Sequence, residues 1–395
     1  MKDAPRVALV ACYSLLESDP RVTRQIDWLV SAGYTVDTVG LGGLPRPTVR
    51  RHYAIRPLRG LLAFRLVRLG IHVLLPRRAR FAMLEQARIP RELRSAHGSY
   101  DLIVANEIDL LPWVTGVGQR LLATGGRTHV DLHEYHRWAG EGSGRLATSV
   151  FGGYHSWLLS RAGSPVVTSR STVADKLADL YATDFGVARP SVVRNSPARV
   201  ELDPRPVDPN RIELVYHGFA ELARGLHLLV DAMRLSSSRF RLNLMLTGGE
   251  EAKHSLAAAA ADLGDRVRIV PAVAMDEVSR AINEFDLEVV FIPPTTLSFE
   301  YALPNKFFEA VQGRVGLIIG NSPSMVEITT HYGNGVVVDG WTAADLARTL
   351  DALDVETVTR LKQASVQCAN DLNSEHEGRA FLASVAGQDA STPSS

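Results

Sequence analysis

A lysine and a glutamate stand about one helical turn apart in the second half of the chain, in the segment Pro304-Asn305-Lys306-Phe307-Phe308-Glu309. A proline suits the first position of a helix, because its missing N–H costs nothing there. The N–H groups that such a helix leaves free, together with Asn305 and Lys306, would attract an anion, and Glu309 could accept hydrogen bonds from a diol. These residues favour a nucleoside diphosphate site. A surface Lys306–Glu309 ion pair without function is the alternative.

A second anion-binding pattern precedes this segment. Gly218 directly follows an apolar run, and Arg224-Gly225 opens an amphipathic stretch. A glycine between a strand and a helix lets backbone amides approach a phosphate, and a planar guanidinium can bind a diphosphate through two hydrogen bonds. We therefore expect Gly218 and Arg224 to contact the same anion as Lys306. A loop that only caps a helix is the alternative.

Polar side chains also follow apolar runs in the first half of the chain. The candidates for a cleft there are Asp19, Arg21, Glu107, His133, Glu134 and Ser169. Asp19 is expected to cap a helix that Pro20 begins, which would leave Arg21 to contact a phosphate or an acceptor. A solvated arginine and a structural histidine are the alternatives for Arg21 and His133.

The elements that must position these residues alternate regularly. Apolar strands rich in Val, Ile and Leu are predicted, among others, at Val7–Ala11, Leu102–Ala105, His129–Leu132, Pro165–Thr168, Glu213–His217, Leu242–Leu246, Glu288–Ile292 and Gly316–Ile319. Helical stretches such as Arg21–Ala32 and Pro304–Gln312 separate them. This alternation is typical of parallel sheets covered on both faces, and it occurs twice. We predict an α/β protein with two doubly wound, Rossmann-like domains, whose ligands bind at the carboxyl ends of the strands.

A proline-rich stretch without periodicity marks the boundary between the two domains. We expect a first domain over 1–196, a linker over 197–210, a second domain over 211–370, and a helix with a frayed tail over 371–395. The length of 395 residues suits such an arrangement.

The net charge of zero conceals an uneven distribution. Residues 1–200 contain 27 Lys and Arg against 16 Asp and Glu, and residues 201–395 contain the reverse. The excess lies in the segment 46–94, which has 13 arginines and two acidic residues, and we expect it to be a helical insertion. Arginines that alternate with leucines at helical spacing suit an anionic membrane surface. A helix pair packed on its domain, with solvated arginines, is the alternative; nucleic acid is not expected.

Composition excludes several other classes. Cys12 and Cys368 are too few for a disulfide scaffold, and no apolar run is long enough to span a membrane. No signal-peptide pattern opens the chain, so we expect a cytoplasmic location, with the inner face of the cell membrane as the alternative. No His, Cys and Asp cluster has metal-ligand spacing, since His129, His133 and His136 would not converge from a strand and a loop. We expect neither metal nor cofactor.

The order of these pieces resembles the GT-B glycosyltransferases, in particular the retaining enzymes of the family 4-like, group 1 type, over nearly the whole chain. Four motifs carry the resemblance: Ser18-Asp19-Pro20-Arg21-Val22, Val130-Asp131-Leu132-His133-Glu134, His217-Gly218 with Arg224-Gly225-Leu226, and Leu303-Pro304-Asn305-Lys306-Phe307-Phe308-Glu309. The resemblance implies a transferase that moves a hexose-type sugar from a nucleotide-diphosphate sugar to an acceptor hydroxyl with retention and without a metal, in the synthesis of a cell-surface glycan, a glycolipid or a natural-product glycoside.

The resemblance also implies roles for individual residues. Arg224 and Lys306 would neutralise the leaving diphosphate, Glu309 would bind the ribose, and His133 would contact the transferred sugar. The sequence departs from the family pattern at two places. Phe219 and Ala220 replace a phosphate-binding residue that often follows the first glycine, and Tyr301, next to Glu300, occupies the position of the first of two usual glutamates. Glu300, Tyr301 or nearby backbone amides would then bind the donor sugar.

Two other classes of function use the same diphosphate site. One is a nucleotide-sugar epimerase or a pseudo-glycosyl coupling enzyme, which the departure at Tyr301 keeps open. The other is a protein that binds sugar nucleotides without catalysis. Product analysis with a panel of donors distinguishes all three classes.

Overall fold

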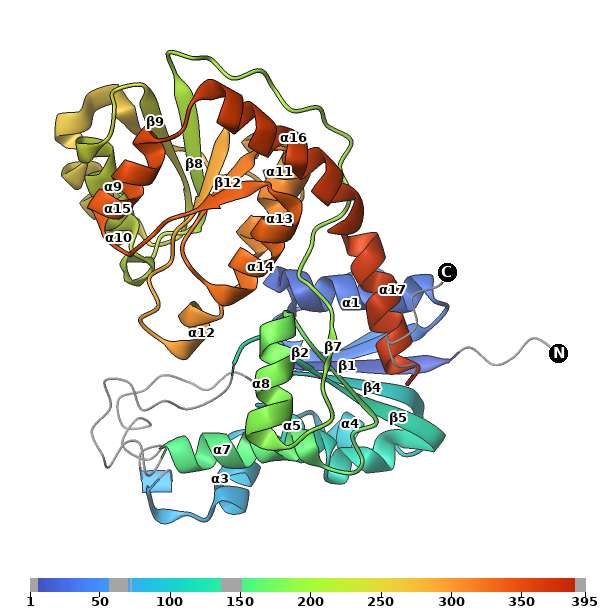
Figure 1. Cartoon of the computed structure of the whole chain (residues 1–395). Helices are drawn as coiled ribbons and strands as arrows, with labels where there is room; N and C mark the ends of the chain where they lie inside the picture. Colours follow the sequence, from blue (N-terminus) through green and yellow to red (C-terminus); the bar gives the residue numbers. More distant parts are fainter. Residues whose placement is uncertain (1–5, 57–69, 72, 136–150, 388–395) are drawn as a thin grey trace. The chain divides into compact units, whose positions relative to one another are not determined.

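The computed structural model of the chain describes residues 6–56, 70–71, 73–135 and 151–387. It divides into two compact units (Figure 1). The first contains residues 1–194 and the C-terminal segment from Gly378, and the second runs from Asn195 to Glu377. The proline-rich stretch that was expected to be a linker thus lies at the start of the second unit. Each unit is described by itself.

The first unit is built on a parallel sheet of seven strands in the order β3-β2-β1-β4-β5-β6-β7. The strands are β1 (Val7–Leu15), β2 (Thr35–Leu41), β3 (Arg51–Ala54), β4 (Tyr100–Asn106), β5 (Leu122–Leu132), β6 (Ser169–Thr172) and β7 (Ser191–Val192). The order reverses direction between β1 and β4, whose residues Ala8 to Cys12 pair with Leu102 to Asn106. The polar residues that follow β1, β4 and β5 therefore meet at one edge of the sheet.

Short helices connect these strands. They are α1 (Pro20–Ser31), α3 (Arg77–Leu84), α4 (Arg91–Ser95), α5 (Leu111–Val114), α7 (Gly153–Leu159) and α8 (Asp175–Phe185), with 3-10 turns at Leu16–Ser18, Gln86–Arg88, Val117–Leu121 and Ser160–Gly163. One face of the sheet is buried by Val22, Ile26 and Leu29 of α1. The last helix, α17 (Ser374–Val385), adds Phe381 to this core, with its ring 5.5 Å from that of Trp28.

Two expectations about the first unit are wrong. Pro165–Thr168 is not a strand, because Pro165 has no N–H to donate and the N–H of Val167 closes a turn onto the carbonyl of Ser164; β6 begins only at Ser169. The segment 46–94 is not wholly helical. Its residues Arg51–Ala54 form edge strand β3, where they pair with Asp37 to Gly40 of β2. Residues 57–69 and 72 of this segment lie outside the described residues.

The second unit contains a parallel sheet of six strands in the order β10-β9-β8-β11-β12-β13. The strands are β8 (Ile212–Phe219), β9 (Phe240–Thr247), β10 (Val267–Val270), β11 (Leu287–Val290), β12 (Gly316–Ile319) and β13 (Gly335–Val337). The direction reverses between β8 and β11, where Leu287 and Glu288 pair with Leu214 and Val215. The carboxyl ends of β8 and β11 are thus the expected place for a ligand.

Helices cover both faces of this sheet (Figure 1). They are α9 (Leu226–Leu235), α10 (Glu250–Ala259), α11 (Val278–Ile282), α12 (Leu297–Glu300), α13 (Asn305–Gln312), α14 (Pro323–Tyr332), α15 (Ala343–Asp351) and α16 (Val355–Asp371), with 3-10 turns at Leu222–Arg224, Ala261–Arg266 and Met275–Glu277. Apolar residues of α9 and α15 pack with Leu214 and Tyr216 of β8 into one core. The other face carries α13, whose Phe307 and Phe308 are fully buried.

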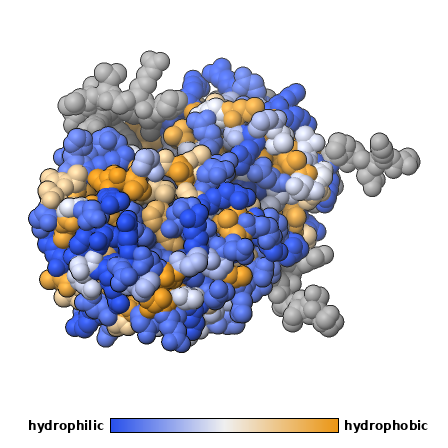
Figure 2. Space-filling model, turned by 90° about the horizontal axis from the view of Figure 1, so that it is seen from above, coloured by the Kyte–Doolittle hydropathy of each residue, from blue (hydrophilic) through white to orange (hydrophobic). Residues whose placement is uncertain are grey.

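The two parallel sheets confirm the predicted fold class of two doubly wound α/β domains. None of the helices in the described part of the chain combines the length and the apolar character that a membrane crossing requires. On the face shown in Figure 2, hydrophobic residues lie interspersed with hydrophilic ones.

Candidate functional site

Helix α13 brings Lys306 and Glu309 to the sheet of the second domain. Its N-cap is Pro304, so the helix begins at Asn305, one residue later than predicted. Phe307, Phe308 and Val311 are buried and anchor the helix on the sheet. Lys306 and Glu309 project from the same helix toward β8, because residues three apart lie on one helical face.

Lys306 is buried, and its amine has no hydrogen-bond acceptor in the part of the chain that the structure describes. Its side chain is 6% exposed, and its Nζ makes no hydrogen bond within the described residues. The amine lies 3.3 Å from the centre of the Tyr216 ring, a cation–π contact. It also lies beside Gly218, whose φ of 128° is a conformation that glycine favours; a Cβ there would lie 3.4 Å from the amine. A buried ammonium with three donors and no acceptor is a site for an anion.

Glu309 does not pair with Lys306, so the interpretation of these two residues as an ion pair is wrong. The Oε2 of Glu309 lies 2.7 Å from Nε2 of His217, and the Nδ1 of His217 lies 3.1 Å from Oε2 of Glu288. Burial alone would lower the pKa of His217, but the carboxylates of Glu288 and Glu309 raise it to about 9. The imidazole is therefore protonated at neutral pH and bridges two carboxylates.

Arg224, Asn305, Glu300 and Tyr301 were also expected to bind the donor. Arg224 is 32% exposed, and its Nε donates to Oε2 of Glu221 at 2.9 Å. The amide of Asn195 donates to Oδ1 of Asn305. Glu300 is the last residue of α12 and is partly exposed; the following carbonyl, of Tyr301, accepts a hydrogen bond from Ser324.

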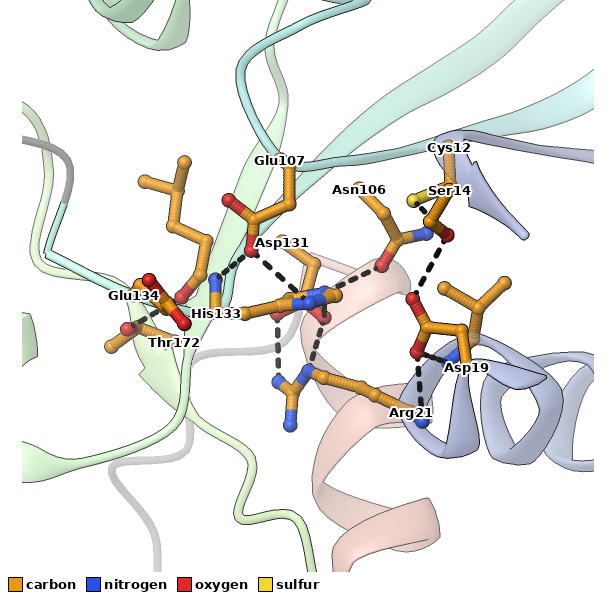
Figure 3. Close-up of polar contacts among 12 residues, drawn as sticks. Cys12, Ser14, Asp19, Arg21, Asn106, Glu107, Asp131, His133, Glu134 and Thr172 are labelled. Atoms are coloured by element: carbon orange, nitrogen blue, oxygen red, sulfur yellow. Dashed lines mark hydrogen bonds and ion pairs between the residues drawn. The ribbon is translucent and has the colours of Figure 1, made fainter. Parts of the chain in front are cut away.

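The first domain has its own polar cluster, centred on Asp131 at the end of β5 (Figure 3). Arg21 binds both carboxylate oxygens of Asp131, with its Nε 2.6 Å from Oδ2 and its Nη2 2.8 Å from Oδ1. The Nη1 of Arg21 donates to the carbonyl of Val193 at 2.7 Å. Burial would raise the pKa of Asp131, but Arg21 and His133 lower it well below its usual range. The prediction that Arg21 binds phosphate or acceptor is thus contradicted, because its guanidinium is engaged inside the domain.

His133 follows β5 directly and joins this cluster; its predicted contact with a sugar stays a prediction. Its Nε2 lies 3.2 Å from Oδ2 of Asp131 and 2.9 Å from Oδ1 of Asn106, and its Nδ1 lies 3.1 Å from Oε1 of Glu107 (Figure 3). Burial would lower the pKa of His133, but Glu107 and Asp131 raise it above its usual range. Glu107 has a φ of 63°, which is unusual for a residue other than glycine. Such backbone strain often occurs at functional sites.

The remaining candidates of the first domain are Asp19, Ser169 and Glu134. Asp19 caps α1 as predicted, since its carboxylate accepts from the N–H groups of Arg21 and Val22. Ser169 lies in β6 rather than after a strand, and its Oγ contacts Nδ1 of His129 at 2.8 Å. Glu134 is exposed.

From the sequence alone, we did not identify several residues of the Asp131 cluster in the first domain and of the group around Glu309 in the second. In the first domain these are Asn106 and Gln25, which contact His133 and Asp131. In the second they are His217 and Glu288. A charged residue inside an otherwise apolar strand, such as Glu288 in Leu287–Val290, was the available signal. No cluster of His, Cys, Asp and Glu in the described ranges has the arrangement of a metal site.

Comparison of the folds defines the class of protein. The chain superposes on a sucrose-phosphate synthase from Thermosynechococcus elongatus with a TM-score of 0.68 at 14% identity, covering 95% of this chain and 97% of that one. A glycosyltransferase from Rickettsia africae gives 0.63 at 12% identity, with coverages of 98% and 100%. Anabaena HepE in complex with UDP gives 0.65 at 13% identity, with coverages of 96% and 99%. The fold is that of the GT-B glycosyltransferases.

A match to a known family lies in the sequence of the second domain. Residues 201–364 match the family model of the glycosyl transferases of group 1. No curated protein sequence matches the chain significantly. The second domain therefore resembles the group 1 glycosyltransferases in sequence, and both domains together have the GT-B fold, in agreement with the resemblance stated above.

Proposed function

We propose that the protein transfers a hexose-type sugar from a nucleotide-diphosphate sugar to an acceptor hydroxyl with retention and without a metal. The observation that carries this proposal is the buried amine of Lys306, which has no hydrogen-bond partner in the described part of the chain. A pyrophosphate beside Gly218 and the N-terminus of α13 would supply the missing acceptors. Glu309, one turn deeper, would bind the ribose.

Stabilisation of the leaving group would account for catalysis. As the bond between the anomeric carbon and the diphosphate breaks, negative charge accumulates on the diphosphate, close to Lys306. A preformed cation at that point typically contributes a factor of about a hundred or more to the rate. Arg224 would add a second, more solvent-exposed cation. In a retaining transfer, the departing phosphate itself can accept the proton of the acceptor hydroxyl, so no dedicated base is needed.

Nucleotide binding is the direct test. We expect UDP, GDP, ADP or dTDP to stabilise the protein in thermal unfolding, since a ligand at a hundred times its dissociation constant contributes about 2.7 kcal/mol. The Lys306→Met variant should lose this stabilisation, whereas Lys253→Met, at a surface lysine paired with Glu250, should keep it. No stabilisation by any of the four nucleotides in the wild-type protein would contradict the proposal.

The acceptor side of the reaction is assigned to the first domain, where His133 is the candidate for a hydrogen bond to the transferred sugar or the acceptor. Its two ring nitrogens contact Asp131, Asn106 and Glu107, so a hydrogen bond to a hydroxyl would have to replace one of these contacts. A His133→Ala variant should therefore lose transfer but keep nucleotide binding. Loss of both activities together would assign His133 a structural role instead.

We also propose peripheral contact with anionic lipid near α3. Val73, Leu74 and Met83 expose their side chains, with Leu74 79% exposed, next to the exposed Arg77 and Arg78. Apolar side chains among arginines fit an anionic membrane surface, at the inner face of the cell membrane. Flotation with phosphatidylglycerol vesicles at low salt should carry the protein, and phosphatidylcholine vesicles should not. Absence of binding to the anionic vesicles would contradict this contact.

A further inference from the structure

Three ionisable side chains form a buried line in the second domain, and each comes from a different element. Glu288 lies in β11, His217 in β8 and Glu309 in α13. Glu288 is fully buried, and the side chains of His217 and Glu309 are 7% and 12% exposed. His217 contacts Glu309 through Nε2 at 2.7 Å and Glu288 through Nδ1 at 3.1 Å, and its backbone N–H donates to Oε1 of Glu288 at 3.3 Å.

Stability alone does not explain this line of charges. Burying an ionised group costs several kcal/mol, and a well-packed apolar replacement of a buried ion pair is often as stable as the pair. The neighbours of Glu288 in its strand are Leu287, Val289 and Val290, all buried. An apolar side chain at this position would suit such a strand equally well. A reason other than folding is therefore needed for the carboxylate behind His217.

The reason lies in the position of Glu309, the most exposed of the three side chains. Both ring nitrogens of His217 face carboxylates, so both carry protons and donate, which agrees with a pKa raised to about 9. His217 thereby fixes the position of Oε2 of Glu309. The remaining lone pairs of this carboxylate can then accept hydrogen bonds from two neighbouring hydroxyls. Glu288 in turn fixes the orientation of the imidazole.

Strand β8 contacts α13 at two consecutive residues. Tyr216 lies under the amine of Lys306, and His217 binds Glu309. One strand therefore positions both the cation for a diphosphate and the carboxylate for a diol.

We propose that His217, supported by Glu288, is a positioning residue that orients Glu309 toward the 2′- and 3′-hydroxyls of a ribonucleoside diphosphate. This inference rests on the proposed function and specifies its donor as a ribonucleotide. It assigns His217 no contact with the substrate.

The experiment compares ribo and 2′-deoxy forms of the nucleoside diphosphate that stabilises the wild-type protein most. Calorimetry should give a preference for the ribo form of tenfold or more. A His217→Phe/Glu288→Leu double variant removes the imidazolium together with the carboxylate behind it, and Glu309, which is 12% exposed, loses its contact with His217. The double variant should bind the ribo form about tenfold more weakly and the deoxy form unchanged, because Lys306 is untouched. His217→Gln, which retains one donor, should keep part of the preference, and His227→Phe on α9, an exposed histidine, should keep all of it.

Each outcome decides between the two proposals. If the wild-type protein binds no nucleoside diphosphate, the proposed function fails and this inference fails with it. If the wild-type protein prefers the ribo form and the folded double variant keeps that preference, only the role of His217 is overturned. If the wild-type protein binds both forms equally, the ribose contact of Glu309 is overturned while diphosphate binding stands.

Discussion

The two domains treat their buried cations in opposite ways. In the first, the guanidinium of Arg21 is 2% exposed and binds both oxygens of Asp131 and a backbone carbonyl. In the second, the amine of Lys306 is almost as buried but has no hydrogen-bond acceptor among the described residues. Both cations lie near the carboxyl end of a parallel sheet.

This difference separates a structural cation from one kept for a ligand. The charge of Arg21 is satisfied within its own domain and serves to hold Asp131 and, through it, His133. The amine of Lys306 contacts the Tyr216 ring but meets no hydrogen-bond acceptor among the residues described, which costs stability in the absence of an anion. Proteins retain such a cost mainly where function requires it.

Removal of Arg21 should have the largest effect on stability. An Arg21→Met variant leaves the Asp131 carboxylate buried without its main partner, and breaking a buried pair on one side costs about 3–5 kcal/mol. Urea unfolding followed by circular dichroism measures the loss. As a control, Arg189→Met breaks an exposed pair with Asp179 and should cost less than about 1 kcal/mol. Equal losses in the two variants would show that burial of the Arg21 pair carries no special weight.

The pH dependence of stability should differ between the domains. His217 has its pKa raised to about 9, so its stabilisation is complete below the unfolded value of about 6.5 and is lost as the pH rises through 9. For His129, burial lowers the pKa to about 4, so its stabilisation is complete above about 6.5 and is lost as the pH falls through 4. Each change amounts to up to about 3 kcal/mol.

Urea titrations across this pH range measure both changes. The His217→Phe/Glu288→Leu variant should flatten the dependence between pH 6.5 and 9. The contribution of His133, whose pKa is also raised, stays in both proteins and cancels in the comparison. A variant whose alkaline dependence matched that of the wild type would show that His217 is not charged in the folded protein.

Replacement of Lys306 should lower activity and leave stability intact, whereas replacement of Arg21 should lower stability. A Lys306→Met variant removes a buried charge that has no hydrogen-bond acceptor within the described ranges, so the unliganded protein should be at least as stable as the wild type. Its rate of sugar transfer should fall about a hundredfold, the scale of a lost contact to a developing anion. Steady-state kinetics measures the expected loss of rate, and urea unfolding of the same preparation measures the stability. A destabilised variant with an unchanged rate would make Lys306 the structural cation.

Much of this comparison could be predicted from local sequence. The alternation of strands and helices predicts two parallel sheets, and the residues after each strand predict where polar side chains gather. Asp19 as a helix cap, Lys306 in the first turn of its helix and His133 at the end of its strand all depend on neighbours in the chain. Local chemistry determines these features, so a single sequence reveals them.

The partners of these residues depend on contacts between distant segments. Arg21 has the composition and position of a ligand-binding arginine, and only the folded chain brings Asp131, 110 residues away, to its guanidinium. His217 and Glu309 are 92 residues apart, and their contact likewise has no local signature. The turn at Pro165 is different, because the missing N–H of the proline was visible in the sequence and outweighs the apolar pattern of Val166 and Val167.

Removal of divalent cations should have the smallest effect. If Lys306 neutralises the leaving diphosphate, assisted by Arg224 and the N-terminus of α13, a divalent ion would compete for the same oxygens and add little. Transfer measured with EDTA should therefore match transfer measured with Mg²⁺, in the wild-type protein. The Lys306→Met variant sharpens this test, because Mg²⁺ could partly replace the lost charge and raise its residual rate. A wild-type rate that collapsed with EDTA and returned with Mg²⁺ would show that a metal ion, rather than Lys306, neutralises the leaving diphosphate. Neither domain would then use its buried cation to bind a ligand.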